Sequence, residues 1–381
     1  MIKIIADENI PYVAEVFEHF GEVVTMAGRN ITPETLGDAE CLLVRSITKV
    51  NENLLKGSKI RFVATATIGF DHIDTAYLAK KGIGFSSAPG SNATSVAEFV
   101  ISSLLNLSAK YSFKLSDKSI GIVGVGNVGS RVAARCRALG MKVLLNDPPL
   151  FEKSGDENYR PIESLYDCDI LTFHTPLTKE GKHQTKHLIN SEFLAKTKPG
   201  LILFNTSRGS VGNTEAILEA IKSGHISSAV FDVWEKEPEI SAELHAVTDI
   251  ATPHIAGYSF DGKVRGTEMI YRAAAAFFDI ESQWRLELPP PIVPEITLSK
   301  KYGSSEEALR EIALKVYDVM EDDQRMRKMA YEPTETRGKF FDRLRKEYPV
   351  RREFANTHVV LQKKDEALTQ LLEAMDFSVS D

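Results

Sequence analysis

The sequence has little cysteine and no long apolar run. Its three cysteines, Cys41, Cys136 and Cys168, are scattered through 381 residues. They form no disulfide framework or CxxC site, so they predict buried thiols in a reducing compartment. No apolar stretch reaches the roughly 20 residues of a membrane span, and the N-terminus lacks the pattern of a signal peptide. We therefore expect a cytoplasmic protein with no membrane partner.

An excess of positive charge is also missing. The chain carries 46 Lys and Arg against 53 Asp and Glu, for a formal charge of -7. This balance gives no support for a nucleic-acid partner. The 43% hydrophobic and 26% charged content is ordinary for a globular protein, and the length favours two or three domains. No residue spacing indicates a metal site.

A glycine-rich turn stands near the middle of the chain. Residues Ser119 to Gly140, SIGIVGVGNVGSRVAARCRALG, read as a strand, a turn at Gly124-Val125-Gly126-Asn127-Val128-Gly129 and a helix. In such a turn Gly124 permits the bend, Gly126 lets the backbone approach a pyrophosphate, and Gly129 lets the helix pack on the strand. The first N–H groups of the helix would face the anion.

Asp147 ends the next apolar run, about twenty residues past these glycines, where an acid can hold the adenosine ribose hydroxyls. A carboxylate there favours NAD over NADP because it would repel a 2′-phosphate. Turn, helix and acid together predict an NAD site. The alternative is a glycine-rich turn in an ordinary α/β unit.

Before this turn, residues 1 to about 90 alternate β-rich runs with helical segments, which predicts a parallel sheet covered by helices. The expected strands are Lys3 to Ala6, Val23 to Met26, Cys41 to Val44, Arg61 to Ala66 and Ile83 to Ser86. Parallel sheets bind ligands beyond the carboxyl ends of their strands. Arg45-Ser46 and Thr67-Ile68-Gly69 are therefore candidate substrate loops, with ordinary polar loops as the alternative.

A second doubly wound unit is expected to follow a capping box at Ser95 to Glu98, which opens a helix to about Leu107. After the glycine turn, polar residues follow each of four predicted strands, as a cofactor cleft requires. These strands are Asp169 to Phe173, Leu201 to Phe204, Ser228 to Phe231 and Asp249 to Ala251. A helix from Lys263 to Phe278 would return the chain to the first domain.

The proline-rich stretch Trp284 to Pro294 reads as a stiff linker before a third, smaller α/β module. The sequence thus predicts a substrate-binding domain of residues 1–94 and 258–285, a Rossmann domain of residues 95–257 and a C-terminal domain of residues 286–381. The last contains a basic segment, Lys339 to Arg352, with two interpretations. It forms a solvated helix face, or it contacts an anionic ligand or a partner subunit.

Three residues at predicted strand ends suit hydride-transfer chemistry. The guanidinium of Arg208 can hold a carboxylate through two hydrogen bonds, and His254 can exchange a proton with a hydroxyl. Glu237 can fix the tautomer of that imidazole and raise its pKa. From position alone, these three could equally be salt-bridged surface residues. His174 is expected to line the cofactor site rather than to act as an acid or base.

At these residues the sequence resembles the D-2-hydroxyacid dehydrogenases. The resemblance rests on the glycine turn and on Asn205-Thr206-Ser207-Arg208-Gly209, Asp232-Val233-Trp234-Glu235-Lys236-Glu237-Pro238 and Thr252-Pro253-His254-Ile255-Ala256-Gly257. It implies a flavodoxin-like domain beside a Rossmann NAD domain, and Arg208, Glu237 and His254 as the catalytic residues.

The resemblance also assigns binding residues. Contacts with NAD are expected from Gly124, Gly126, Asn127, Val128, Gly129, Asp147, His174, Thr175, Thr206, Ser207, Arg208, Asp232 and Gly257. Substrate contacts are expected from Arg45, Ser46, Thr67, Ile68, Gly69 and Tyr258.

Narrower signatures, such as Asn146-Asp147-Pro148-Pro149 and Phe341-Asp342-Arg343-Leu344-Arg345-Lys346, resemble a branch of the family that oxidises 4-phospho-D-erythronate with NAD on the route to pyridoxal phosphate. In that branch the C-terminal domain forms a homodimer. The alternatives are another D-2-hydroxyacid dehydrogenase, such as one acting on 3-phosphoglycerate, and a non-catalytic NAD-sensing corepressor-like scaffold.

Overall fold

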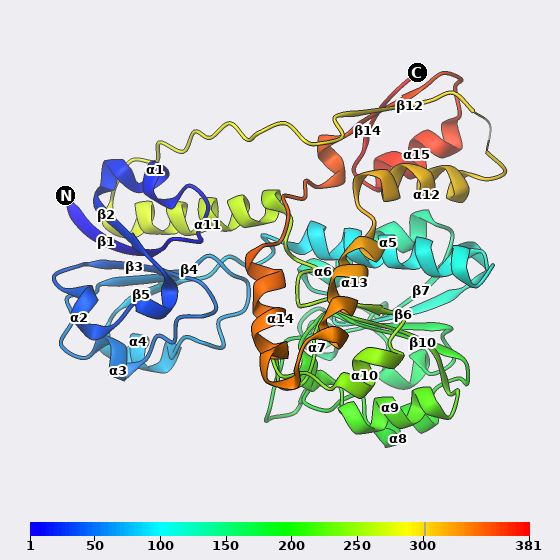
Figure 1. The fold of residues 1–381 in the computed structure, drawn as a ribbon, viewed down its shortest axis with the longest axis horizontal. Coiled ribbons are helices and arrows are strands. Elements are labelled where there is room, and N and C mark those ends of the chain that lie inside the picture. The colour runs from blue at the N-terminus through cyan, green and yellow to red at the C-terminus, as the bar shows by residue number, and fades with distance from the viewer. Residues whose placement is uncertain (301) are drawn as a thin grey trace. The chain divides into compact units, whose positions relative to one another are not determined.

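The computed structural model describes residues 1–300 and 302–381 and divides into two compact units. The first unit comprises Met1–Asn92 and Ser259–Pro289, and the second comprises Ala93–Tyr258 and Pro290–Asp381. Figure 1 shows the elements of both units in chain order. The predicted C-terminal domain falls within the second unit in this division, so its separate status stays a proposal.

The first unit is built on a five-stranded parallel sheet of order β2-β1-β3-β4-β5. Its strands are β1 (Ile2–Asp7), β2 (Gly21–Met26), β3 (Cys41–Val44), β4 (Phe62–Thr65) and β5 (Gly84–Ser86). Its helices are α1 (Val13–Phe17), α2 (Pro33–Leu36), α3 (Glu52–Leu55), α4 (Thr75–Lys81) and α11 (Phe260–Phe278). This is the flavodoxin strand order, and its switch point lies between β1 and β3.

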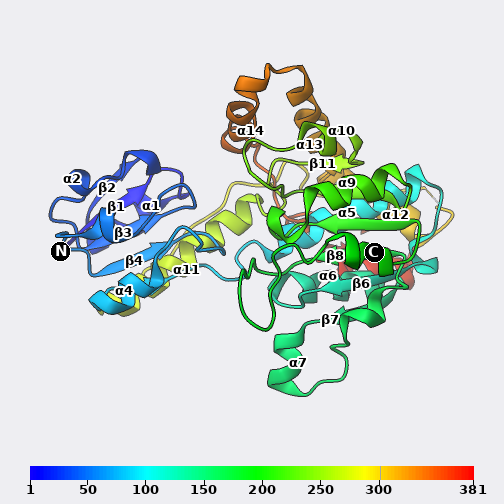
Figure 2. The ribbon, with the colours of Figure 1, turned by 90° about the horizontal axis from the view of Figure 1, so that it is seen from below.

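The second unit contains a six-stranded parallel sheet of order β11-β10-β9-β8-β6-β7. Its strands are β6 (Ser119–Val123), β7 (Lys142–Asn146), β8 (Ile170–Phe173), β9 (Leu201–Asn205), β10 (Ile226–Phe231) and β11 (Ile250–Ala251). Its helices are α5 (Ala93–Lys110), α6 (Asn127–Ala138), α7 (Pro148–Ser154), α8 (Ser191–Lys196), α9 (Thr214–Lys222) and α10 (Ala242–Val247). The edge strand β7 leads into α7 (Figure 2).

Both faces of this second sheet are buried. Alternate residues of β9 enter different apolar clusters, with Ile202 and Phe204 joining α5 and α6, and Leu201 and Leu203 joining α8 and α9. Successive side chains of a strand point to opposite faces, so the two helix pairs cover opposite sides of the sheet, as Figure 1 shows. Burial on both faces explains why these strands read as continuous apolar runs.

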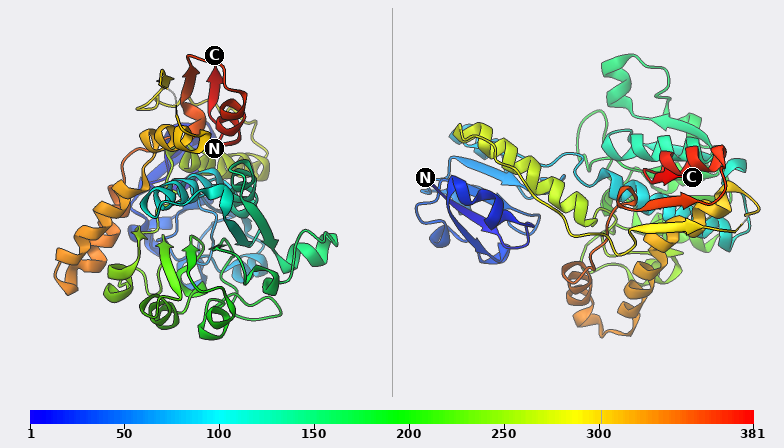
Figure 3. Two further views of the ribbon diagram at one scale, coloured as in Figure 1. Left: turned by 90° about the vertical axis from the view of Figure 1, so that its right-hand side faces the viewer. Right: turned by 90° about the horizontal axis from the view of Figure 1, so that it is seen from above.

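The C-terminal region adds a three-stranded parallel sheet of order β12-β13-β14, which Figure 3 shows beside α15. Its elements are β12 (Glu295–Leu298), α12 (Ser305–Val316), α13 (Val319–Arg327), α14 (Arg337–Lys346), β13 (His358–Leu361), α15 (Glu366–Ala374) and β14 (Ser378–Ser380). Leu309 and Phe354 belong to the same apolar cluster as Phe99 of α5. This shared core joins the C-terminal sheet to the second unit.

The predicted fold class is confirmed: two parallel sheets of the dehydrogenase type and a small third sheet. All three cysteines are buried, as expected. No described helix is long and apolar enough to cross a membrane.

At Arg351 and Arg352 the basic segment is neither a solvated helix face nor a contact with a ligand or a partner subunit. Both side chains are buried inside their own chain, where Arg351 reaches Ser95 and the carbonyl of Ala256, and Arg352 reaches Asn356. A run of charges in sequence is typical of a solvated face, and nothing in this run distinguishes the arginines that the fold encloses.

Candidate active site

The glycine turn forms at the switch point of the second sheet, between β6 and β8. Gly124 has φ 87°, and a Cβ at Gly129 would stand 2.0 Å from the carbonyl oxygen of Gly124. Both positions therefore require glycine for the fold itself. At Gly126, by contrast, an added Cβ would meet nothing within 4 Å, so the fold itself does not require glycine there and open space lies beside the turn.

The residues around this turn fit NAD. Helix α6 starts at Asn127 with no side chain capping its first N–H groups, which leaves these donors for a phosphate. Thr175 Oγ1 is buried and has no partner in the described part of the chain, as expected of a hydroxyl that awaits a ligand group.

Asp147 also works as a structural residue. One carboxylate oxygen accepts from the N–H of Val125 at 2.8 Å, and the other accepts from the N–H of Leu150 at 3.0 Å. The side chain thus caps α7 and fixes the glycine turn to the end of β7. A carboxylate held in this way is preorganised for ribose hydroxyls.

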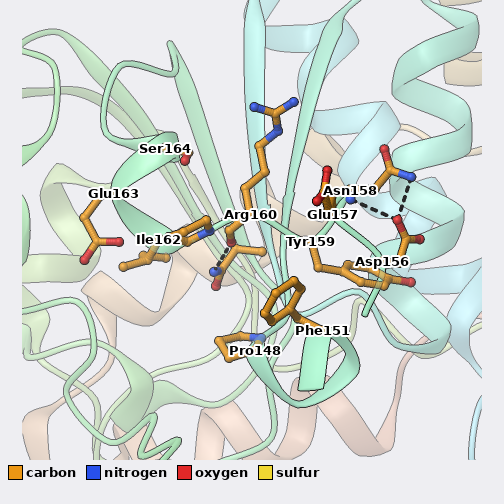
Figure 4. A pocket seen from close by; sticks show the side chains of 12 residues that line it. Pro148, Phe151, Asp156, Glu157, Asn158, Tyr159, Arg160, Ile162, Glu163 and Ser164 are labelled. Atoms are coloured by element: carbon orange, nitrogen blue, oxygen red, sulfur yellow. Dashed lines mark hydrogen bonds between the residues drawn. The ribbon is translucent and has the colours of Figure 1, made fainter. Parts of the chain in front are cut away.

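A cavity of about 750 Å³ lies beside this strand end (Figure 4). Asn146 and Pro148, the neighbours of Asp147, line it together with the loop from Asp156 to Ser164. Arg208, Glu237 and His254 are absent from its lining, so this cavity is not the place of the chemistry.

His174 bridges two strand ends of the cofactor region. Its ring nitrogens lie 3.0 Å from Thr172 Oγ1 and 2.9 Å from Thr206 Oγ1. Burial lowers the pKa of His174 to about 3, so the ring is neutral at physiological pH. A neutral ring with both nitrogens in hydrogen bonds is poorly suited to proton transfer, and the role of His174 in the cofactor site stays a prediction.

His254 and Glu237 form a hydrogen-bonded pair. Nδ1 of His254 lies 2.7 Å from Oε2 of Glu237, and the N–H of Trp234 donates to Oε1 at 2.8 Å. Burial raises the pKa of Glu237, but the charge and hydrogen bond of His254 outweigh burial and hold that pKa below its ordinary value. An ionised Glu237 therefore accepts from Nδ1–H, which leaves Nε2 of His254 to exchange a proton with a substrate.

Asp232 stabilises the loop that carries His254 through hydrogen bonds. Its carboxylate accepts from the N–H groups of Ile255 at 2.7 Å and Ala256 at 3.0 Å, and from the hydroxyl of Thr252 at 2.6 Å. His254 itself has φ 59°, an uncommon conformation for a non-glycine residue. The Asp232 contacts keep this conformation in place, and such residues concentrate at functional sites.

Arg208 follows the end of β9. In the sheet, β9 is next to β10, and β10 is next to β11. The side-chain amide of Asn205 donates to the carbonyl of Arg208 at 3.1 Å and shapes the turn. A Cβ at Gly209 would stand 1.9 Å from the backbone of Trp234, so the two loops are in direct contact. The three predicted catalytic residues thus occupy neighbouring strand ends of one sheet.

The substrate loops predicted in the first unit lie at the carboxyl ends of β3 and β4. Arg45 Nη1 donates to the carbonyl of Asn9 at 3.4 Å, beside the β1–β3 switch point. The Thr67 hydroxyl donates to the carbonyl of Gly69 at 2.9 Å, so this loop is internally braced. Ser46 is exposed and Ile68 half-buried on the same two loops.

The sequence did not single out Asp7, and it pointed to Arg345 only as one member of the basic segment. Asp7, at the end of β1, is fully buried, and its Oδ2 has no partner in the described part of the chain. Arg345 lies in α14 against Tyr258, which is close in sequence to His254. A lone acid after a strand and one arginine in a basic helix carry no pattern that a single sequence can reveal.

Two family models match different parts of the chain. Residues 99–256 match the family model "D-isomer specific 2-hydroxyacid dehydrogenase, NAD binding domain", and residues 287–375 match a domain of unknown function (DUF3410). Erythronate-4-phosphate dehydrogenase of Cronobacter sakazakii is 45% identical over 382 aligned residues, covering 100% of this chain and 99% of the relative. That of Proteus mirabilis is 46% identical and covers 100% of both chains. This chain belongs to the erythronate-4-phosphate dehydrogenase family.

Solved structures agree at the level of the wider family. D-Lactate dehydrogenase from Aquifex aeolicus, crystallised with NAD and lactic acid, is 28% identical, with a TM-score of 0.60 over 73% of this chain and 95% of its own. NAD-bound 3-phosphoglycerate dehydrogenase from Entamoeba histolytica is 26% identical, with a TM-score of 0.63 over 75% and 99%. The protein is an NAD-binding dehydrogenase, which confirms the predicted cofactor and enzyme class.

Proposed function

We propose that this enzyme oxidises 4-phospho-D-erythronate at C2, giving 2-oxo-3-hydroxy-4-phosphobutanoate, with Arg208, Glu237 and His254 as its catalytic residues. The His254–Glu237 hydrogen bond carries the chemical part of the proposal. The end-to-end similarity to enzymes named for this substrate supports its identity.

The chemistry divides between the cofactor and the side chains. NAD, when bound, accepts the hydride that leaves C2. Nε2 of His254 takes the proton of the C2 hydroxyl, so that the C–O bond becomes a carbonyl, and the carboxylate of Glu237 stabilises the imidazolium that forms. Arg208 holds the substrate carboxylate and the developing carbonyl, assisted by the backbone N–H groups of Ile68 and Gly69.

Several further assignments belong to the same proposal. The NAD contacts at Gly126, Asn127, Asp147 and Thr175 rest on the shape and free donors of the glycine turn. The substrate contacts at Ser46, Thr67 and Tyr258 rest on family resemblance. The cytoplasmic location stays a prediction from the cysteines.

A homodimer formed through the C-terminal region is a further part of the proposal. Large apolar side chains stand exposed there, at Ile292 (86%), Tyr331 (90%) and Val350 (56%). Ile292 and Val350 line one hollow of this region, and neighbouring exposed apolar groups are typical of an interaction surface.

A single-turnover experiment tests the substrate. Purified protein is mixed with NAD and 4-phospho-D-erythronate, 3-phosphoglycerate or D-lactate, and nicotinamide absorbance is followed. We expect NADH only from the erythronate ester, and none in His254→Ala. NADH formation with 3-phosphoglycerate instead would show that the substrate assignment is wrong, and the proposed catalytic residues would be unaffected. No response to any hydroxy acid would favour a non-catalytic scaffold.

A further inference from the structure

The C-terminal region packs directly against the loop that carries Glu237. A Cβ at Gly338, in the first turn of α14, would stand 2.6 Å from Oε1 of Glu239 and 3.4 Å from Pro238. Helix α14 therefore lies on the segment immediately after the catalytic carboxylate. Figure 1 shows this helix beside α13 in the second unit.

The same helix brings a cation close to the catalytic residues. The guanidinium carbon of Arg345 lies 5.9 Å from the ring centroid of Tyr258, within the range of a cation–π contact. The ring of Tyr258 also meets that of Tyr348 edge-on, with the ring centroids 5.8 Å apart. Tyr258 follows His254 by four residues.

The donors of Arg345 are incompletely used. Its side chain is 22% exposed, and its charge partner Asp342 is 3.8 Å away, beyond hydrogen-bond distance. Its Nε is buried and has no partner among the described residues. A buried N–H donor without a partner on a charged side chain is costly unless a ligand satisfies it.

The electrostatics agree with this position. Burial lowers the pKa of Arg345, but Tyr258 and then Glu237 raise it above its usual value. Arg345 is therefore a permanent cation in the electrostatic field of the catalytic carboxylate. A substrate that brings a dianionic group to this side of His254 would meet an oppositely charged, preorganised fork.

We propose that Arg345 binds the phosphate of the substrate and so makes the C-terminal region of the same chain a determinant of specificity. The proposal rests on the proposed function, because it requires a phosphorylated hydroxy acid. It also gives the basic segment a role within its own subunit, in place of the contact across a dimer that the sequence suggested.

Comparing a phosphorylated substrate with its unphosphorylated counterpart separates phosphate binding by Arg345 from other roles of this residue. We expect Arg345→Gln to lower kcat/KM for 4-phospho-D-erythronate roughly 10- to 100-fold, mainly through KM, as expected for a lost hydrogen bond between charged groups. Slow oxidation of unphosphorylated D-erythronate should stay unchanged, as should the pH profile. The kcat/KM of Arg345→Lys for the phosphorylated substrate should lie between those of the wild type and Arg345→Gln, because lysine keeps the charge but lacks the paired N–H donors of the guanidinium. The matched control is Arg343→Gln, on the same helix but 54% exposed.

Binding of inorganic phosphate gives a second measurement that does not depend on turnover of D-erythronate. Its dissociation constant, measured by isothermal titration calorimetry, should rise in Arg345→Gln and stay unchanged in Arg343→Gln, while that of oxamate, which lacks a phosphate, should not change. An equal loss with both substrates, a shifted pH profile or an unchanged phosphate constant would overturn the proposal. Failure of the wild type to oxidise 4-phospho-D-erythronate would refute the proposed function instead, and the phosphate constants would still test Arg345.

Discussion

Arg351 donates a hydrogen bond to the carbonyl oxygen of Ala256 at 3.3 Å, two residues after His254. Its guanidinium carbon lies 3.8 Å from the centroid of the Tyr317 ring, and the side chain is 6% exposed. The charge of Arg351 also acts on Glu98, a fully buried carboxyl of α5. One side chain therefore connects the C-terminal region to α5 and to the loop that carries His254.

Removing this cation should destabilise the fold. Burial raises the pKa of Glu98 to about 8 even beside Arg351, so the lost interactions are those of the guanidinium itself. Arg351→Met removes its hydrogen bonds to Ser95 and to the carbonyl of Ala256, which should cost about 1.5–3 kcal/mol. Urea unfolding followed by fluorescence measures the loss. The exposed Arg343→Gln should change stability by less than about 0.5 kcal/mol. Equal stability of Arg351→Met and wild type would show that the buried charge is dispensable.

Alanine substitutions at Gly129 and Gly126 of the glycine turn should have different effects. Gly129→Ala places a Cβ 2.0 Å from the Gly124 carbonyl oxygen, so we expect loss of stability or of soluble protein. Gly126→Ala meets no protein atom within 4 Å, so we expect a normally folded protein that has lost NAD affinity. Thermal unfolding and NAD titration on both variants separate the two effects. Wild-type NAD affinity in Gly126→Ala would place the pyrophosphate elsewhere.

The sequence predicted the strands and the glycine turn well because each has a local signature. Buried parallel strands give apolar runs, and Gly124 to Gly129 combines a bend with a helix start. The assignment of Arg208, Glu237 and His254 as catalytic residues stays a prediction, which started from their positions after strand ends. Resemblance to a known family was needed to separate them from surface residues.

The contributions of α14 and Arg351 could not be predicted in this way. Arg345 and Arg351 look alike in the sequence, as members of one basic run, and only tertiary packing places one beside Tyr258 and buries the other under Ala256. The same holds for Asp7, whose burial depends on strands that are distant in sequence. Such roles depend on long-range contacts, which local periodicity does not record.

Asp169 should make the stability of the second unit dependent on acid. Burial raises the pKa of Asp169, but hydrogen bonds from Lys198 at 2.6 Å and from Ser119 bring it down to about 2. A depressed pKa stabilises the folded state above the unfolded value near 3.8, and this contribution is lost as pH falls towards 2. We expect Asp169→Asn to cost roughly 2 kcal/mol at pH 7 and about half as much at pH 3. Urea unfolding at both pH values checks this, and a pH-independent difference would contradict it.

The exposed apolar side chains of the C-terminal region should control assembly. Ile292→Asp and Val350→Asp place a charge at positions that are 86% and 56% exposed, so neither variant disturbs a packed core. If these residues form the dimer interface, a buried charge there is costly, and both variants should shift towards monomer in analytical ultracentrifugation. Val247→Asp, at a position 38% exposed in α10, is the control and should leave the assembly unchanged.

Glu237→Gln tests the catalytic pair. The amide keeps the size of the side chain but removes the charge that stabilises a protonated His254, so we expect kcat to fall about 10²- to 10⁴-fold with little change in NAD affinity. His187→Asn is a matched control, because His187 also pairs with a carboxylate, Glu235, at 2.7 Å, but has no place in the proposed mechanism. Steady-state kcat measured for both variants checks this, and only Glu237→Gln should be slow. A wild-type rate in that variant would leave His254 without its proposed support.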